Sequence, residues 1–71
     1  MLEMSEHFVN IKANDGNIYA YNSIFGNLTK LSKKDVELVS KINKREKVDE
    51  ETYKDEIKKM KNKNFIKNVE N

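Results

Sequence analysis

The sequence predicts a small α+β domain in which a three-stranded antiparallel meander is followed by two or three helices. The first third of the chain alternates apolar and polar residues between two glycine-containing turns, and alternation of this kind is typical of strands. After Ser32 the apolar residues recur every three or four positions, which is the spacing of amphipathic helices. An antiparallel sheet covered on one face by helices would bury both apolar sets, in a layout of winged-helix type.

The length of the chain favours one domain. A chain of 71 residues buries only about 60% of the surface that it exposes when unfolded, which leaves room for one core. We expect residues 1–6 to be a flexible lead-in, residues 7–67 to form the single domain, and residues 68–71 to be a polar tail.

The first two strands are predicted to form a hairpin closed by Asp15 and Gly16. Asp-Gly at the two central positions is a strong signal for a type I′ turn, which needs positive φ at both residues. A two-residue loop pairs Ala13 with Ile18 and Ile11 with Ala20. This register predicts a core face of Val9, Ile11, Ala13, Ile18 and Ala20, and an opposite face of Phe8, Asn10, Lys12, Tyr19 and Tyr21.

A third strand is predicted over residues 28–31, after a reversal at Gly26 and Asn27, the two residue types that most readily adopt positive φ. Leu28 is expected to contact the core. The strand lies at an edge of the meander, where neither proline nor an evident bulge protects it and only Lys30 adds a charge. Its outer backbone groups are therefore expected to be unpaired.

The first helix is expected to begin after Ser32. Ser32 and Asp35 have the spacing of a capping box, in which each side chain accepts a hydrogen bond from the backbone of the other residue. The polar residues 43–47 form a connector, and residues 43–51 could hold a short third helix. The apolar stripe of the first helix consists of Val36, Leu38, Val39 and Ile42.

A second clear helix is expected after Asp49, which is a favourable N-cap residue. Tyr53, Ile57 and Met60 recur at helical spacing and predict its buried stripe. The end of the helix is marked by residues that suit a left-handed C-cap and a return to the core: Asn62, Asn64, Phe65 and Ile66.

Catalysis is not expected of this chain. It has no cysteine and one histidine, His7, so cysteine nucleophiles, thiolate metal sites and histidine-based triads have no members. Its paired carboxylates are sequence neighbours, which point about 100° apart on a helix and do not converge. No cofactor is predicted. The chain also lacks a membrane-spanning apolar run and a signal-peptide pattern, so we expect a cytoplasmic protein without a membrane partner.

Nucleic acid is a weaker candidate partner than peptide. A DNA-binding winged helix usually directs the start of its recognition helix to the major groove. Here that helix opens with Asp49, Glu50 and Glu51, which would meet phosphates with like charge. Neither predicted turn carries a basic cluster. DNA binding and a purely structural or dimerisation role remain as alternatives.

Peptide binding fits the predicted edge strand, because an extended peptide can add to such an edge as a new strand. We expect Thr29→Pro to remove a ladder donor and weaken peptide binding without unfolding the domain. The predicted contacts are Leu28, Thr29, Lys30 and Leu31 for backbone pairing, with Tyr53, Ile57, Met60 and Lys61 on the side of a neighbouring helix.

Three segments resemble the N-terminal part of radical SAM/SPASM peptide maturases. Tyr-Asn-Ser-Ile-Phe-Gly at residues 21–26 resembles their YNSxxG hairpin, and Val-Glu-Leu-Val at residues 36–39 resembles the helix that follows it. Residues 57–66 are similar to the Leu-x-x-x-Gly-Phe-Leu end of that segment, with Asn64 in the place of the glycine.

The resemblance implies a PqqD-like recognition element for ribosomally synthesised and post-translationally modified peptides, a small winged-helix domain. Such a domain holds the leader of a precursor peptide as an added strand beside its third strand. The resemblance also implies two partners, the precursor leader peptide and a radical SAM/SPASM catalytic domain in cis or in trans. The iron–sulfur and SAM chemistry would belong to that catalytic domain.

Overall fold

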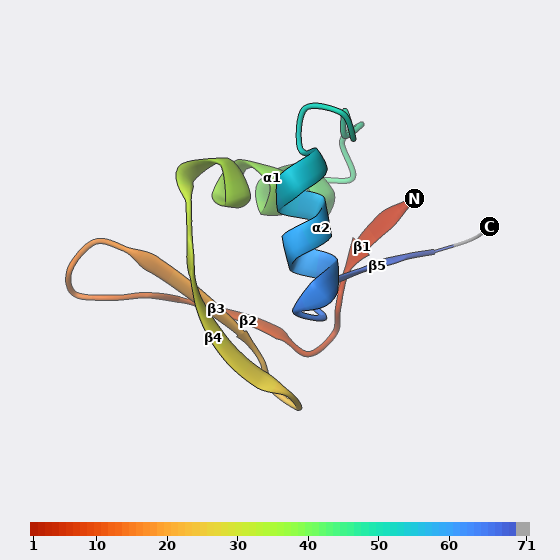
Figure 1. Ribbon diagram of the computed structural model, residues 1–71. Coiled ribbons are helices and arrows are strands. Elements are labelled where there is room, and N and C mark those ends of the chain that lie inside the picture. The colour runs from red at the N-terminus through yellow and green to blue at the C-terminus, as the bar shows by residue number, and fades with distance from the viewer. Residues whose placement is uncertain (70–71) are drawn as a thin grey trace.

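The computed structural model describes residues 1–69 and confirms an α+β fold with a three-stranded antiparallel sheet and two helices (Figure 1). Between the two helices, residues 44–53 consist of turns and irregular backbone, so the optional third helix is not formed. In chain order, the elements are β1 (Leu2–Met4), β2 (Phe8–Lys12), β3 (Ile18–Asn22), β4 (Gly26–Leu31), α1 (Lys33–Asn43), α2 (Lys54–Asn62) and β5 (Ile66–Asn68).

The strands form two separate antiparallel sheets. One has the order β2-β3-β4, and the other pairs β1 with β5, so that Met4 lies opposite Ile66 (Figure 1). Residues 1–6, expected to be a flexible lead-in, thus contain a strand. The C-terminal end of the predicted domain and the start of the predicted polar tail contribute its partner.

The hairpin between β2 and β3 has a three-residue loop, so the predicted register is wrong by one residue. Lys12 lies opposite Ile18, and Ala13 donates its amide to the carbonyl of Asn17 at 2.8 Å. Gly16 donates to the carbonyl of Ala13 at 3.0 Å and has a φ of 86°. This is the pattern of a type I turn followed by one left-handed residue, which needs a single glycine and leaves Asp15 unstrained.

A one-residue slip moves every side chain of a strand to the opposite face. Phe8 therefore shares a face with Ala20, and its ring meets that of Phe65 edge-on with centroids 5.3 Å apart. Ile11 lies opposite Tyr19 on the outer face and is 46% exposed. The predicted assignments of Phe8 to the outer face and of Val9, Ile11 and Ala13 to the core face are therefore wrong, because the turn chemistry selected the longer loop.

A bulge interrupts the pairing of β3 with β4. Ala20 lies opposite Thr29 and Asn22 opposite Gly26, so two residues of β4, Asn27 and Leu28, face the single residue of β3 between them. Asn27 has a φ of 63°, and Leu28 is 67% exposed. Two sequence-based expectations are wrong here: the edge strand does contain a bulge, and Leu28 is not in the core.

One apolar core joins the helices to the inner face of the three-stranded sheet. The predicted apolar stripes of both helices are buried in it, except that Val36 is partly buried. The predicted return of Phe65 and Ile66 to the core is confirmed. The buried residues are Ala20, Leu31, Leu38, Val39, Ile42, Tyr53, Ile57, Met60, Phe65 and Ile66.

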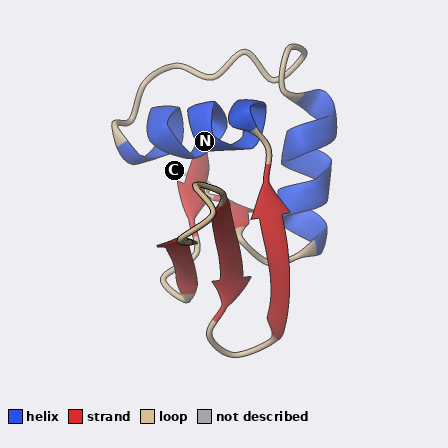
Figure 2. Ribbon diagram, turned by 90° about the vertical axis from the view of Figure 1, so that its left-hand side faces the viewer, coloured by secondary structure: helices blue, strands red, loops and turns tan. Residues whose placement is uncertain are grey.

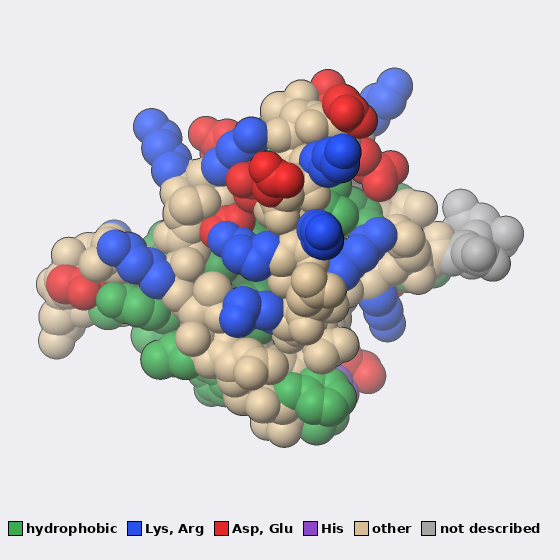
Figure 3. All heavy atoms as spheres, in the orientation of Figure 1, with side chains coloured by type: hydrophobic (Ala, Val, Ile, Leu, Met, Phe, Trp, Pro, Cys, Tyr) green, Lys and Arg blue, Asp and Glu red, His purple; other side chains and the backbone are tan. Residues whose placement is uncertain are grey.

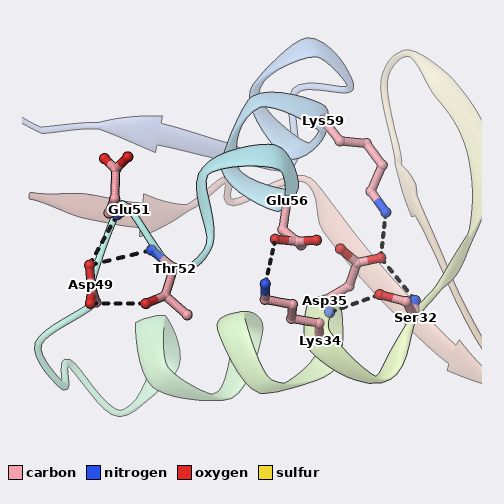
Figure 4. A network of polar contacts seen from close by, with 8 residues as sticks. All are labelled: Ser32, Lys34, Asp35, Asp49, Glu51, Thr52, Glu56 and Lys59. Carbon is pink, nitrogen blue, oxygen red and sulfur yellow. Dashed lines mark hydrogen bonds and ion pairs between the residues drawn. The ribbon is translucent and has the colours of Figure 1, made fainter.

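Helix α1 begins with the predicted capping box. The amide of Asp35 donates to Ser32 Oγ at 3.1 Å, and the amide of Ser32 donates to Asp35 Oδ2 at 2.9 Å (Figure 4). Both interactions satisfy amides that a helix start leaves unpaired. Because Leu31 immediately precedes the cap, the box also fixes the direction in which the chain leaves β4.

Helix α2 begins at Lys54, later than predicted. Asp49 caps the turn before it: its carboxylate accepts hydrogen bonds from the amides of Glu51 and Thr52 and from the Thr52 hydroxyl (Figure 4). The hydrogen bonds from Thr52, and then that from Glu51, lower the pKa of the Asp49 carboxyl. At the other end Asn64 adopts the left-handed C-cap conformation with a φ of 61°, whereas Asn62 remains helical.

Candidate functional site

Strand β4 is an edge strand of the three-stranded sheet. Within residues 1–69 it pairs with β3 and with no other strand. Figure 2 shows β4 at the end of the sheet that lies nearer α2. The predicted edge position of the third strand is therefore confirmed, although the strand begins at Gly26 and not at residue 28.

The register shows which backbone groups of β4 point away from β3. Hydrogen-bonded and non-hydrogen-bonded pairs alternate along an antiparallel ladder. The backbone hydrogen bonds from Ala13 to Asn17 and from Ser23 to His7 show which pairs of the β2–β3 ladder are hydrogen-bonded. Every second residue of β3, starting at Tyr19, therefore bonds to β2. The residues between them direct their backbone groups to β4.

It follows that Thr29 and Leu31, the partners of Ala20 and Ile18, bond inward to β3. The amide and carbonyl of Lys30 point outward instead. Thr29→Pro would consequently remove a donor to β3 and not a donor to an added peptide. Proline at Lys30 is the substitution that removes an outward donor.

A surface groove of about 500 Å³ adjoins the bulged end of β4. Five of its lining residues come from α2 and the residue that follows it, at the helical spacing of one face, and Asn27 comes from β4. Figure 3 shows lysine side chains gathered on this side of the molecule, around α2. The groove is lined by Asn27, Asp55, Lys58, Lys59, Asn62 and Lys63.

The predicted helix-side contacts do not line this groove. Tyr53, Ile57 and Met60 are buried in the core, so the expectation that they face a groove is wrong. Lys61 is exposed but lies outside the lining. The missed residues follow the polar stripe at i, i+3, i+4 and i+7 from Asp55, opposite the apolar stripe, and that stripe is the signal by which they could have been found.

Lys59 connects the groove to the start of α1. Its Nζ atom forms an ion pair with Asp35 Oδ2, which is fully buried and also accepts the capping hydrogen bond from Ser32 (Figure 4). A second ion pair joins Lys34 of α1 to Glu56 of α2 at 3.7 Å. These two contacts join α2 to the first turn of α1, which follows β4 directly.

Two other surfaces lie outside this groove. A hollow of about 680 Å³ lies between the β2–β3 turn and α1, with Ile18, Leu31 and Val36 among its lining residues. The tip of the β3–β4 hairpin exposes Ile24 and Phe25 by 63% and 62%. Neither surface offers an unpaired strand edge.

No group of three or more His, Asp or Glu side chains in residues 1–69 is arranged to hold a metal ion. No helix among these residues has the length and apolar character needed to cross a bilayer.

Comparison with known proteins gives no relative: no family model matches the chain, and no match was found among curated proteins or solved structures. Three features of the chain bear on its function: the edge of β4, the groove beside it and the resemblance of the sequence segments.

Proposed function

We propose that this chain is a winged-helix-like, PqqD-like recognition domain that binds the leader of a ribosomally synthesised precursor peptide by strand addition to β4. In this proposal the domain performs no chemistry. It delivers the peptide to a radical SAM peptide maturase, either linked to it or as a separate protein. The observation that carries the proposal is the outward-facing backbone of Lys30 at the β4 edge, next to the groove of α2.

Strand addition suits this edge for a physical reason. An extended peptide placed beside β4 would exchange hydrogen bonds with the amide and carbonyl of Lys30, as peptides do at other open sheet edges. Binding the leader would hold the rest of the precursor near the catalytic domain and raise its effective concentration there. Recognition of the leader and modification of the core peptide are then separate tasks.

Lys30→Pro tests the proposal, because proline removes the outward amide and keeps the inward ones. Lys12→Pro is the matched control: Lys12 lies opposite Ile18 in a non-hydrogen-bonded pair, so its amide points outward at the other edge of the sheet. A dodecapeptide selected from a random phage-displayed library would serve as the probe.

We expect Lys30→Pro to weaken binding of the selected peptide about tenfold or more, which corresponds to about 1.4 kcal/mol, and Lys12→Pro to leave it unchanged. Amide hydrogen exchange gives a second measurement. The Lys30 amide should become protected when the peptide binds, whereas Thr29 and Leu31 should be protected beforehand. Equal affinities for both variants, or no added protection at Lys30, would reject strand addition at β4.

The same experiment separates the two alternatives. If two β4 edges pair in a dimer, Lys30 is protected without peptide, and the protection falls on dilution. If the domain binds duplex DNA, affinity falls steeply with salt and Lys30→Pro has no effect. The acidic first turn of α2, Asp55 and Glu56, argues against DNA at that helix start.

A further inference from the structure

The groove beside β4 carries more positive than negative side chains. Its lining includes three lysines, Lys58, Lys59 and Lys63, and one carboxylate, Asp55. Lys59 is paired with the buried Asp35. Within residues 1–69, Lys58 and Lys63 form no ion pair, so their charges are available to a ligand.

The bulge makes a side-chain anchor necessary. Regular pairing of β4 with β3 covers residues 29–31, and the two bulged residues depart from it. Within that regular segment Lys30 is the one residue whose backbone faces outward, so an added strand gains few backbone hydrogen bonds there. Bulges are known to end or redirect strand pairing. Affinity and register then have to come from side chains next to the bulge, which is where the groove lies.

The chemistry of the lining favours a carboxylate. Ammonium groups bind carboxylates through charge-assisted hydrogen bonds, and the amides of Asn27 and Asn62 add neutral donors at the same place. Asn27 lies three residues before Lys30, and strands rise about 3.3 Å per residue. Because the bulge at Asn27 and Leu28 shortens this span by one residue, an anchoring side chain would lie roughly two residues from the peptide residue that pairs with Lys30.

We infer that the groove between β4 and α2 selects acidic peptides, with a Glu or Asp side chain of the added strand held by Lys58 and Lys63. This inference rests on the proposed strand addition and specifies its ligand. Backbone pairing at Lys30 gives the peptide its extended form, and the carboxylate sets its register.

The test compares two double charge reversals on the same stretch of chain. Lys58→Glu with Lys63→Glu changes the groove, whereas Lys54→Glu with Lys61→Glu changes the net charge equally at exposed lysines outside the lining. Each protein is used to select dodecapeptides from the random phage-displayed library. We expect acidic residues to be enriched on the original chain and on the Lys54/Lys61 variant, and to be lost or replaced by basic residues on the Lys58/Lys63 variant.

Titration of one selected peptide and its Glu→Gln form gives the quantitative result. The Gln form should bind the original chain about tenfold more weakly and should bind the Lys58/Lys63 variant no more weakly than the Glu form. Peptides that depend on Lys30 but show no acidic preference, or an equal loss in both double variants, would overturn the acidic selectivity alone. A selection without any Lys30-dependent peptide would overturn the strand addition and the selectivity with it. Duplex DNA binding that Lys58→Glu with Lys63→Glu abolishes, beside peptides without acidic preference, would assign the groove to nucleic acid.

Discussion

At the scale of single residues, Asn22 connects the edge hairpin to the end of α2. Its side chain is 1% exposed. Its Oδ1 atom accepts hydrogen bonds from the amides of Ile24 and Phe25, and its Nδ2 atom donates to the carbonyl of Asn64 at 2.9 Å. A buried polar side chain with both ends satisfied fixes the turn and the helix cap relative to each other.

Asn22→Ala should lower the free energy of unfolding by roughly 2–4 kcal/mol, because it leaves buried backbone groups without partners. Asn22→Asp is the informative comparison. It keeps the acceptor for the turn amides, loses the donor to Asn64 and places a buried charge near that carbonyl, so a cost below that of Asn22→Ala would show that the turn depends more on Asn22 than the cap does. Urea denaturation followed by circular dichroism measures both. A cost below about 0.5 kcal/mol for Asn22→Ala would contradict this role.

At the scale of elements, the length of the β2–β3 loop determines which side chains of β2 point to the core. With the three-residue loop, Phe8 points to the core and contacts Phe65, while Ile11 lies beside Tyr19 on the outer face. With the two-residue loop that Asp15-Gly16 suggests, these positions would be exchanged. The two loop lengths thus differ in whether Phe8 or Ile11 faces the core, and the cost of replacing each residue can be measured.

Phe8→Ala should cost about 2–4 kcal/mol, since it removes a partly buried ring that packs against the core. Ile11→Thr should cost about 0.5 kcal/mol or less, because this position is exposed and threonine suits a strand. Thermal unfolding of the two variants gives the comparison. A larger cost for Ile11→Thr than for Phe8→Ala would indicate the two-residue loop.

At the scale of the whole molecule, the ends of the described chain complete the fold. β1 pairs with β5, and Leu2 and Met4 pack against the core. Ser5 donates its amide to the carbonyl of Phe65 at 2.8 Å, directly after the cap of α2. The β1–β5 pair therefore holds the end of α2 in place, and with it the helix that lines the groove.

Leu2→Ser with Met4→Ser should lower the free energy of unfolding by roughly 2–4 kcal/mol and the midpoint of thermal unfolding by about 10–20 °C. Glu3→Ser is the control, because Glu3 lies on the same strand between these two residues and points to the opposite face. Differential scanning calorimetry measures all three chains. An unchanged midpoint for the double variant would mean that residues 1–6 are the flexible lead-in that the sequence suggested.

Part of the candidate site was predictable from local sequence. Gly26 and Asn27 placed an edge strand before Ser32, and Ser32 with Asp35 placed the start of α1 after it. The groove residues are not evident from the sequence, because the expected contacts Tyr53, Ile57 and Met60 also form the apolar stripe that the core buries. A helix in a single-core domain buries its apolar face, which leaves the polar face of Asp55, Lys58 and Asn62 for a partner.

The sequence by itself determined the class of the fold, the order of the three-stranded sheet and the two helices that follow it, the capping box and the left-handed cap at Asn64. These features depend on residues close together in the chain, whose periodicity and backbone preferences act locally. The tertiary structure decided the hairpin register, the bulge at Asn27, the β1–β5 pair and the outward direction of the Lys30 backbone. Each of these depends on which distant residues are opposite one another, and a shift of a single residue reverses the result.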